Sequence, residues 1–178
     1  MTKILIVTGS ARLNSVNSKI VKLIEHSTDS QPGTEAHIAD LGQINLPFYD
    51  GVSAPSADGF EISNLSAKKW SDLVSSADAV VFVSPEYNHG LSGLQKNAID
   101  WLYREWTDKP VLFVAYGWYA GAYVLSQLHE IGKVVKWKST QKTVGLRFMQ
   151  DIDLEGNILD DSANQEITHA LAELTSSI

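Results

Sequence analysis

The sequence predicts an α/β fold in which one parallel sheet is covered by helices on both faces. Three observations lead to this prediction: short apolar runs of strand length, helical spacing of apolar residues between them, and regular alternation of the two patterns along 178 residues. A strand covered on both faces is apolar throughout, whereas a strand with one wet face alternates. Repeated strand–helix alternation implies right-handed crossovers and a doubly wound, three-layer sandwich. We therefore expect a single domain over residues 1–178, a length that suits one core.

The first half of the chain supplies two predicted strands and two predicted helices. The run KILIVT (Lys3–Thr8) is apolar and β-branched, as expected of a buried strand, and the apolar residues over 16–24 have helical spacing. Residues Glu35–Asp40 alternate apolar and polar side chains, which predicts a strand on the edge side of the sheet. The segment Leu41–Phe60 is rich in Gly, Pro, Ser and Asp and predicts a long loop. The apolar spacing over Ile62–Ala77 predicts a helix.

The second half repeats the alternation. The unbroken apolar run AVVFV (Ala79–Val83) predicts a buried strand, and apolar residues over 94–102 return to helical spacing. A fourth strand, Val111–Tyr116, starts directly after Pro110, and Gly121–Val135 carries apolar residues on one side of a helix. The last two predicted elements are a fifth strand at Thr143–Phe148 and an amphipathic helix at Ser162–Leu174.

Composition excludes several classes of function. The formal net charge is -7, and a nucleic-acid binder needs a basic face to neutralise phosphates. The chain contains no cysteine, which removes disulfides, thiolate nucleophiles and iron–sulfur ligation. No apolar run approaches the roughly 18 residues of a membrane span, and no signal-like leader precedes the first strand. The five histidines lack metal-ligand spacing. We expect a cytoplasmic protein with no metal, no nucleic-acid partner and no membrane partner.

The loop after the first strand has the residues of an anion site. In parallel sheets ligands bind beyond the carboxyl ends of the strands, so the loops after Thr8, Val83 and Tyr116 are the informative ones. The first of them, TGSARLNSVNSK, offers several hydroxyls, an arginine and the amide groups of a following helix, which together suit a phosphate monoester. The loop lacks both the Gly-Lys-Ser/Thr of a P-loop and the three glycines of a dinucleotide fingerprint. An ordinary helix cap is the alternative, since Ser and Asn are common capping residues.

Two motifs in order resemble those of the NADPH-dependent FMN reductase family, whose members are flavodoxin-like. The motif G-S-x-R-x-x-S-x-N is complete in GSARLNSVN, and P-E-Y-N is followed by K-N-A-I-D-W within SPEYNHGLSGLQKNAIDW. The separation of about 70 residues between the loops also fits, and the resemblance covers nearly the whole chain. It implies a flavodoxin-like domain with a five-stranded parallel sheet of order 2-1-3-4-5 and a bound FMN.

The resemblance assigns roles by position. Hydroxyl, guanidinium and amide groups of the first loop would hold the FMN phosphate. The second loop would lie along the isoalloxazine. There a proline stiffens the strand exit, a tyrosine offers a flat face, and an asparagine can donate and accept hydrogen bonds. The third loop, AYGWYAGAYV, departs from the family pattern because Ala120 and Ala122 stand where glycines are often found, and Trp118 and Tyr119 add bulk at its mouth. The predicted cofactor-binding residues are Ser10, Arg12, Ser15, Val16, Asn17, Pro85, Glu86, Tyr87, Asn88, Tyr116 and Gly117.

The activity implied is FMN-dependent oxidation of NADPH or NADH, with ping-pong transfer to free flavin, a quinone or a similar small acceptor. No side chain needs to act as a general acid, so we predict no catalytic residue. Two alternatives stay open: a flavodoxin-like electron carrier and a flavin-binding interaction module. The resemblance also implies a homodimer or homotetramer, with Tyr103, Trp118, Tyr119 and Tyr123 as exposed aromatic residues at the contact.

Five other residues have simpler expected roles. His89 is expected at the surface or at an interface, and Trp101 and Trp106 in the core or at a subunit contact. Lys96 and Asp100 are four residues apart on a predicted helix, so they are expected to pair along that helix or across a dimer.

Overall fold

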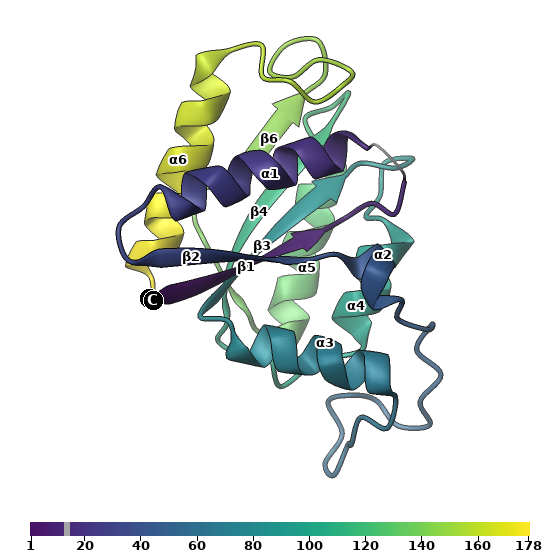
Figure 1. Cartoon of the computed structure of the whole chain (residues 1–178). Coiled ribbons are helices and arrows are strands. Elements are labelled where there is room, and N and C mark those ends of the chain that lie inside the picture. The colour runs from purple at the N-terminus through teal and green to yellow at the C-terminus, as the bar shows by residue number, and fades with distance from the viewer. Residues whose placement is uncertain (13–14) are drawn as a thin grey trace.

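The computed structural model describes residues 1–12 and 15–178 and confirms the predicted α/β architecture (Figure 1). All strand pairs in the sheet are parallel, and the order is β2-β1-β3-β4-β5, with β6 also paired to β4. This is the predicted 2-1-3-4-5 order. The strands are β1 (Thr2–Thr8), β2 (Thr34–Ala39), β3 (Ala79–Pro85), β4 (Pro110–Gly117), β5 (Lys138–Ser139) and β6 (Val144–Arg147).

The fifth position of the sheet is divided between two short strands. β5 pairs with the start of β4, at Pro110 and Val111, whereas β6 pairs with its last four residues. Between them Thr140 still donates from its amide to the carbonyl of Val111 at 2.9 Å, but its hydroxyl turns back to the carbonyl of Lys142. The predicted strand 143–148 corresponds to β6. The two-residue β5 is too short to produce any sequence periodicity.

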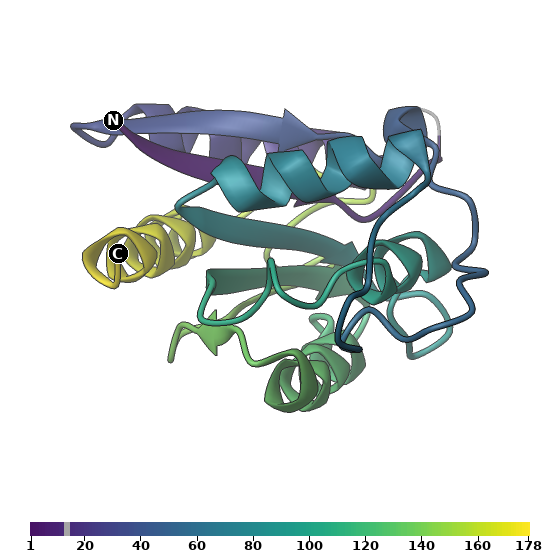
Figure 2. The ribbon, with the colours of Figure 1, turned by 90° about the horizontal axis from the view of Figure 1, so that it is seen from below.

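Helices cover both faces of the sheet and leave its carboxyl edge open. α1 and α6 lie on one face and α3, α4 and α5 on the other (Figure 1). Both chain termini lie at the amino ends of the strands (Figure 2), away from the loops expected to form the site. The helices are α1 (Val16–Asp29), α2 (Leu41–Ile44), α3 (Leu65–Ser76), α4 (Gly93–Asp100), α5 (Ala122–Val135) and α6 (Asp161–Ser176).

The strand β1 shows why the apolar runs are continuous. Leu5 and Val7 belong to the core cluster under α3, α4 and α5, whereas Ile4 and Ile6 belong to the cluster under α1 and α6. Successive side chains of a strand point to opposite faces, so a strand buried on both faces needs apolar residues at every position. Ile4 and Ile6 have no exposed surface, and Leu5 is only 2% exposed.

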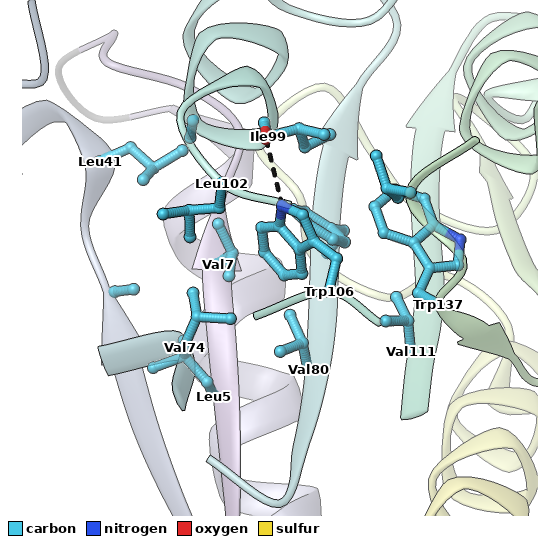
Figure 3. Packing of buried hydrophobic residues seen from close by; sticks show 14 of the residues in the cluster. Leu5, Val7, Leu41, Val74, Val80, Ile99, Leu102, Trp106, Val111 and Trp137 are labelled. Atoms are coloured by element: carbon cyan, nitrogen blue, oxygen red, sulfur yellow. Dashed lines mark hydrogen bonds between the residues drawn. The ribbon is translucent and has the colours of Figure 1, made fainter. Parts of the chain in front are cut away.

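The larger core cluster contains several aromatic side chains among aliphatic ones, including Trp106 and Trp137 (Figure 3). Trp106 contacts Trp70, Phe82 and Trp137 with ring centroids 5.7–6.0 Å apart, and its indole Nε1 donates to the carbonyl of Ile99 at 3.1 Å. A buried indole N–H needs such a partner, because an unpaired one would lose its hydration without replacement. Trp101 is also buried and donates to the carbonyl of Pro47 at 2.8 Å. Both residues are therefore core residues.

The prediction of an uninterrupted loop over Leu41–Phe60 is wrong at its start, where α2 forms. Asp40 caps this short helix by accepting from the amides of Gly42 at 3.0 Å and Gln43 at 3.4 Å, and Asn45 ends it in the left-handed region with φ 52°. Asp and Asn are favoured at these two positions. A four-residue helix cannot show a periodic pattern, so its capping residues were the only local signal.

Within the described parts of the chain, no helix is both long and apolar enough to cross a bilayer.

Candidate functional site

A cavity of about 330 Å³ opens where the loops after β1, β3, β4 and β6 meet, at the carboxyl edge of the sheet. The chain order of the sheet changes direction between β1 and β3, which is where doubly wound folds bind ligands. Eight of the eleven predicted cofactor residues line it: Arg12, Ser15, Val16, Pro85, Glu86, Tyr87, Tyr116 and Gly117. Trp118, Phe148 and Leu154 complete the lining.

The amino end of α1 is suited to an anion. Ser15 is the N-cap, and among the described residues its side chain makes no capping hydrogen bond, so its hydroxyl is available. No acidic residue lies in the first turn, and the amides of Val16 and Asn17 have no acceptor within the helix. Arg12 and Ser15 also line an adjoining cavity of about 380 Å³, together with Ser10. This donor set fits the phosphate monoester of FMN.

A hydrogen bond joins the first and second loops. The hydroxyls of Ser10 and Tyr87 are 2.8 Å apart, and either can donate. The Ser10 hydroxyl also accepts from the amide of Arg12 at 3.2 Å. Tyr87 is half-buried and lines the main cavity, so the predicted phosphate end and the predicted ring end of the site are directly connected.

Asn17 uses its side chain to hold the loops. Its Oδ1 accepts from the amide of Gly9 at 3.1 Å, and its Nδ2 donates to the carbonyl of Val83 at 2.9 Å. The residue is only 1% exposed. Gly9 sits so close to β3 that a Cβ there would lie 2.4 Å from the Val83 oxygen. The Asn17 side chain therefore positions the loop, and the predicted contact with a cofactor remains open to its backbone amide.

The buried Gln95 continues this network and was not found by sequence reasoning. Its Nε2 donates to the carbonyls of Val83 at 3.2 Å and Val7 at 3.4 Å, and its Oε1 accepts from the hydroxyl of Ser84 at 2.8 Å. Gln95 has no exposed surface. A signal was present, because Gln95 shares the buried stripe of α4 with Ile99, where a polar residue needs partners.

The second loop turns sharply after Tyr87. The amide of Tyr87 donates to the carbonyl of Gly90 at 3.1 Å, the reverse bond is 2.9 Å, and Asn88 and His89 have φ of 50° and 59°. Two central residues with positive φ define a type I′ turn, in which Asn is favoured. Asn88 is exposed and does not line the described cavity. Its predicted contact with the flavin stays a prediction, whereas its backbone conformation in the turn is observed.

Glu86 supports the third loop. Its carboxylate Oε2 accepts from the amide of Tyr123 at 3.1 Å, in the first turn of α5, and its own amide donates to the carbonyl of Tyr116 at 2.9 Å. A carboxylate at a helix amino end is favourable both as a hydrogen-bond acceptor and as a charge. His89 is exposed and stacks on Tyr123 with ring centroids 4.2 Å apart, which agrees with its expected surface position. Tyr103, expected among the surface aromatics, is instead partly buried against the core.

Tyr116 and Gly117 form the floor of the third loop. Burial raises the pKa of the Tyr116 phenol, and hydrogen bonding with Asn17 opposes this shift without cancelling it. The phenol is therefore neutral across the physiological range and able to donate. A Cβ on Gly117 would lie 3.0 Å from the Cβ of Glu86, so the two loops approach closely here.

Phe148 and Leu154 were missed as lining residues. Phe148 directly follows β6, and Leu154 lies in the loop beyond it. This loop reaches the start of α1, where Lys19 donates to Asn157 at 3.0 Å. Phe148 had a usable signal, because it follows a predicted strand at the same carboxyl edge. Leu154 had none in its local sequence.

A larger cavity of about 560 Å³ lies between the loop after α2 and α4, with Phe48, Lys96 and Asp100 among its lining residues. It contains none of the predicted cofactor residues. Lys96 and Asp100 pair along the helix at 2.6 Å, one of the two expected arrangements. Over the described residues no group of three or more His, Asp or Glu side chains could hold a metal ion. We assign the site to the smaller cavity, which the strand ends and loops build.

Comparison with known proteins identifies the family of the chain. A protein-family model described as NADPH-dependent FMN reductase matches residues 2–150. An NAD(P)H-dependent FMN reductase of Nectria sp. is 33% identical over 97% of this chain and 89% of its own length. An NADPH:quinone oxidoreductase of Arabidopsis thaliana is 26% identical over 98% of this chain and 90% of its own length.

Solved structures show the same fold. The flavoenzyme NAD(P)H:(acceptor) oxidoreductase FerB of Paracoccus denitrificans superposes with a TM-score of 0.79, at 22% identity, over 99% of this chain and 96% of its own. The matched sequence region contains the loops after β1, β3 and β4 that form the cavity. The chain belongs to the NADPH-dependent FMN reductase family.

Proposed function

We propose that this protein is an NAD(P)H oxidoreductase that holds FMN in the cavity at the carboxyl edge of the sheet. The observation that carries the proposal is the Ser10–Tyr87 hydrogen bond. It connects a helix amino end suited to an anion with a cavity lined by aromatic residues. Small-molecule sites commonly have volumes of roughly 300–1,000 Å³, so about 330 Å³ is compatible with a flat ring system.

The chain's own residues bind and orient. Arg12, Ser15 and the first amides of α1 would hold the phosphate, and Ser10 with Tyr87 would fix the ring relative to it. Bound FMN would supply the redox chemistry, taking a hydride from NAD(P)H and passing two electrons to a second substrate. The neutral phenol of Tyr116 could donate a hydrogen bond into the site without adding charge.

The relatives support the choice of substrates. They are named for FMN and for quinone reduction, and their names specify NAD(P)H or NADPH. We therefore propose free flavin or a quinone as the small-molecule acceptor and either nicotinamide as the reductant. We predict no catalytic general acid among the side chains, because the electron transfers run through the cofactor.

Steady-state kinetics at several acceptor concentrations test this function. If the donor and acceptor use one site in turn, double-reciprocal plots against NADPH are parallel. Intersecting lines contradict a shared site. If the FMN-loaded protein is reduced by NADPH only very slowly and no acceptor increases NADPH consumption, the protein is an electron carrier or a flavin-binding module instead.

We also make proposals for the oligomeric state and the cellular location of the protein. Tyr119 and Tyr123 are 54% and 46% exposed, and an exposed aromatic group of this kind suits a subunit contact. We therefore propose a homodimer or homotetramer. We also propose a cytoplasmic location. Light scattering on a size-exclusion column checks the assembly, and cell fractionation checks the location. A monomer at micromolar concentration would contradict the first point.

A further inference from the structure

Trp118 combines two properties: it belongs to the binding cavity and it is largely exposed to solvent. It lines the cavity, yet 60% of its surface is exposed. A large aromatic face that is open to water at the edge of a binding cavity gains free energy when another apolar surface covers it. Trp118 also adds bulk to a third loop in which Ala120 and Ala122 stand where the family pattern often has glycines. The exposed indole is therefore a candidate contact for a bound ligand.

The loop around Trp118 is tightly folded, so the backbone that carries the indole is held in place. Ala120 donates from its amide to the carbonyl of Gly117 at 3.1 Å, and Ala122 to that of Tyr119 at 3.1 Å. Gly121 has φ 67°, and a Cβ there would lie 2.3 Å from the Cβ of Ala115. The loop therefore has little freedom to withdraw Trp118 from the cavity.

One side of the indole is supported by a second aromatic residue. Trp118 meets Phe148 edge-to-face with ring centroids 5.5 Å apart, and Phe148 meets Tyr116 edge-to-face at 6.0 Å. The amide of Phe148 donates to the carbonyl of Gly117 at 3.2 Å, which fixes the two segments together. Tyr116, Phe148 and Trp118 thus form a continuous aromatic wall from the buried floor to the open rim.

The two charged residues among the described lining, Arg12 and Glu86, already have roles. Arg12 lies beside Ser15 in the loop that leads into α1, and the Glu86 carboxylate caps α5 through the amide of Tyr123. Phe148 meets Trp118 edge-to-face, and Leu154 adds a further apolar side chain to the lining. A wall of this chemistry favours a flat, uncharged ring over a small ion.

We propose that Trp118 is a specificity-determining residue that holds a planar aromatic acceptor of the quinone class by stacking at the rim of the cavity. The inference rests on the proposed function. In the net reaction NAD(P)H gives a hydride equivalent, solvent gives one proton, and the quinone becomes the hydroquinone while NAD(P)H becomes NAD(P)⁺. An acceptor without a ring, such as ferricyanide, accepts one electron per ion and gains nothing from the indole.

The test compares two acceptors in the FMN-loaded protein. For each variant, kcat/KM is measured with 1,4-naphthoquinone and with ferricyanide, and the ratio of the two values is the readout. In ping-pong kinetics the kcat/KM of an acceptor reports only its own half-reaction. We expect Trp118→Ala to lower the ratio about tenfold, the size of one stacked aromatic contact. Trp118→Phe should restore most of the ratio.

Tyr119→Ala is the matched control, because Tyr119 is the next residue, is similarly exposed and does not line the cavity. It should keep the wild-type ratio. An unchanged ratio in Trp118→Ala overturns the inference. So does a loss confined to FMN affinity or to kcat/KM for NADPH, because Trp118 would then contact the cofactor or the nicotinamide. Absence of activity with both acceptors in the wild type would instead contradict the proposed function.

Discussion

The hydroxyl of Ser10 lies 2.8 Å from the phenol oxygen of Tyr87, although 77 positions separate the two residues. The bond crosses the point where the sheet changes direction, between the loop after β1 and the loop after β3. The Ser10 hydroxyl also accepts from the amide of Arg12, so this one hydroxyl links the loop that carries the guanidinium to the loop that carries Tyr87. This link sets the distance between the two ends of the site.

Removing that link should weaken cofactor binding without unfolding the protein. Tyr87→Phe keeps the ring and deletes only the hydroxyl. A net hydrogen bond contributes about 0.5–1.5 kcal/mol, so the Kd for FMN should rise roughly twofold to tenfold. Titration of the apoprotein by flavin fluorescence quenching measures it. Tyr119→Phe, outside the cavity lining, is the control and should bind as the wild type does. Equal affinities for both variants would show that the bond is dispensable.

The role of Arg12 can be separated from that of the ring-binding loops by using two ligands. Arg12→Gln removes the positive charge beside Ser15 but keeps hydrogen-bonding atoms. Charge-assisted hydrogen bonds contribute about 1.5–3 kcal/mol, so FMN should bind roughly tenfold to hundredfold more weakly. Riboflavin lacks the phosphate and should bind both proteins alike. A parallel loss for both ligands in calorimetric titration would place Arg12 away from the phosphate.

Asn17 is expected to matter for stability because both ends of its buried amide are engaged. Asn17→Ala leaves the amide of Gly9 without its acceptor and removes one donor from the Val83 carbonyl. Leaving a buried group unpaired costs about 1–3 kcal/mol, and the free energy of unfolding should fall by that amount. Urea denaturation measures the change. Ser18→Ala, at an exposed position one residue further along α1, should change the unfolding free energy by less than about 0.5 kcal/mol.

Ionisation of Asp153, in the loop that carries Leu154, should make the free energy of unfolding depend on pH. Hydrogen bonds from the side chain and amide of Asn157, and then from the amide of Glu155, lower the pKa of the Asp153 carboxyl below its ordinary value of 3.8. The ionised form is therefore favoured by folding. Its contribution is complete above that ordinary value and is lost as the pH falls through the lower folded-state pKa.

The corresponding experiment compares the wild type with Asp153→Asn. The difference in unfolding free energy should be largest at about pH 6 and smaller at about pH 2.5, because below pH 3.8 the carboxyl binds a proton more readily in the unfolded state than in the folded state. Denaturant titrations at the two pH values measure it. A difference that stays constant with pH would mean that the charge of Asp153 is irrelevant to the loop.

The sheet was predictable because burial on two faces leaves a direct trace in the sequence. Strands such as KILIVT must be apolar at every position when both core clusters use them, and that run appeared as β1. The edge position of β2 followed in the same way from its alternation. The four residues of α2 and the two of β5 left no such trace, because the pattern of an element needs more residues than these contain.

Site residues that belong to a continuous sequence motif were predictable. Residues that reach the site from distant segments were less so. Eight of the eleven predicted residues came together at one cavity. The Nε2 of Gln95 donates to main-chain carbonyls of two strands, and no local pattern specifies these partners. Leu154 reaches the cavity only because the loop after β6 packs on α1, as shown by the Lys19–Asn157 contact. Such contacts follow from tertiary assembly, so only a structure shows them.

The most direct measurement is anaerobic mixing of the FMN-incubated, desalted protein with one equivalent of NADPH, followed by one equivalent of 1,4-naphthoquinone. The account predicts a yellow protein whose absorbance near about 450 nm is lost after NADPH and returns after the quinone, as expected of a bound flavin that carries the electrons. A protein that leaves the desalting column colourless, or one that stays yellow in NADPH, would contradict it.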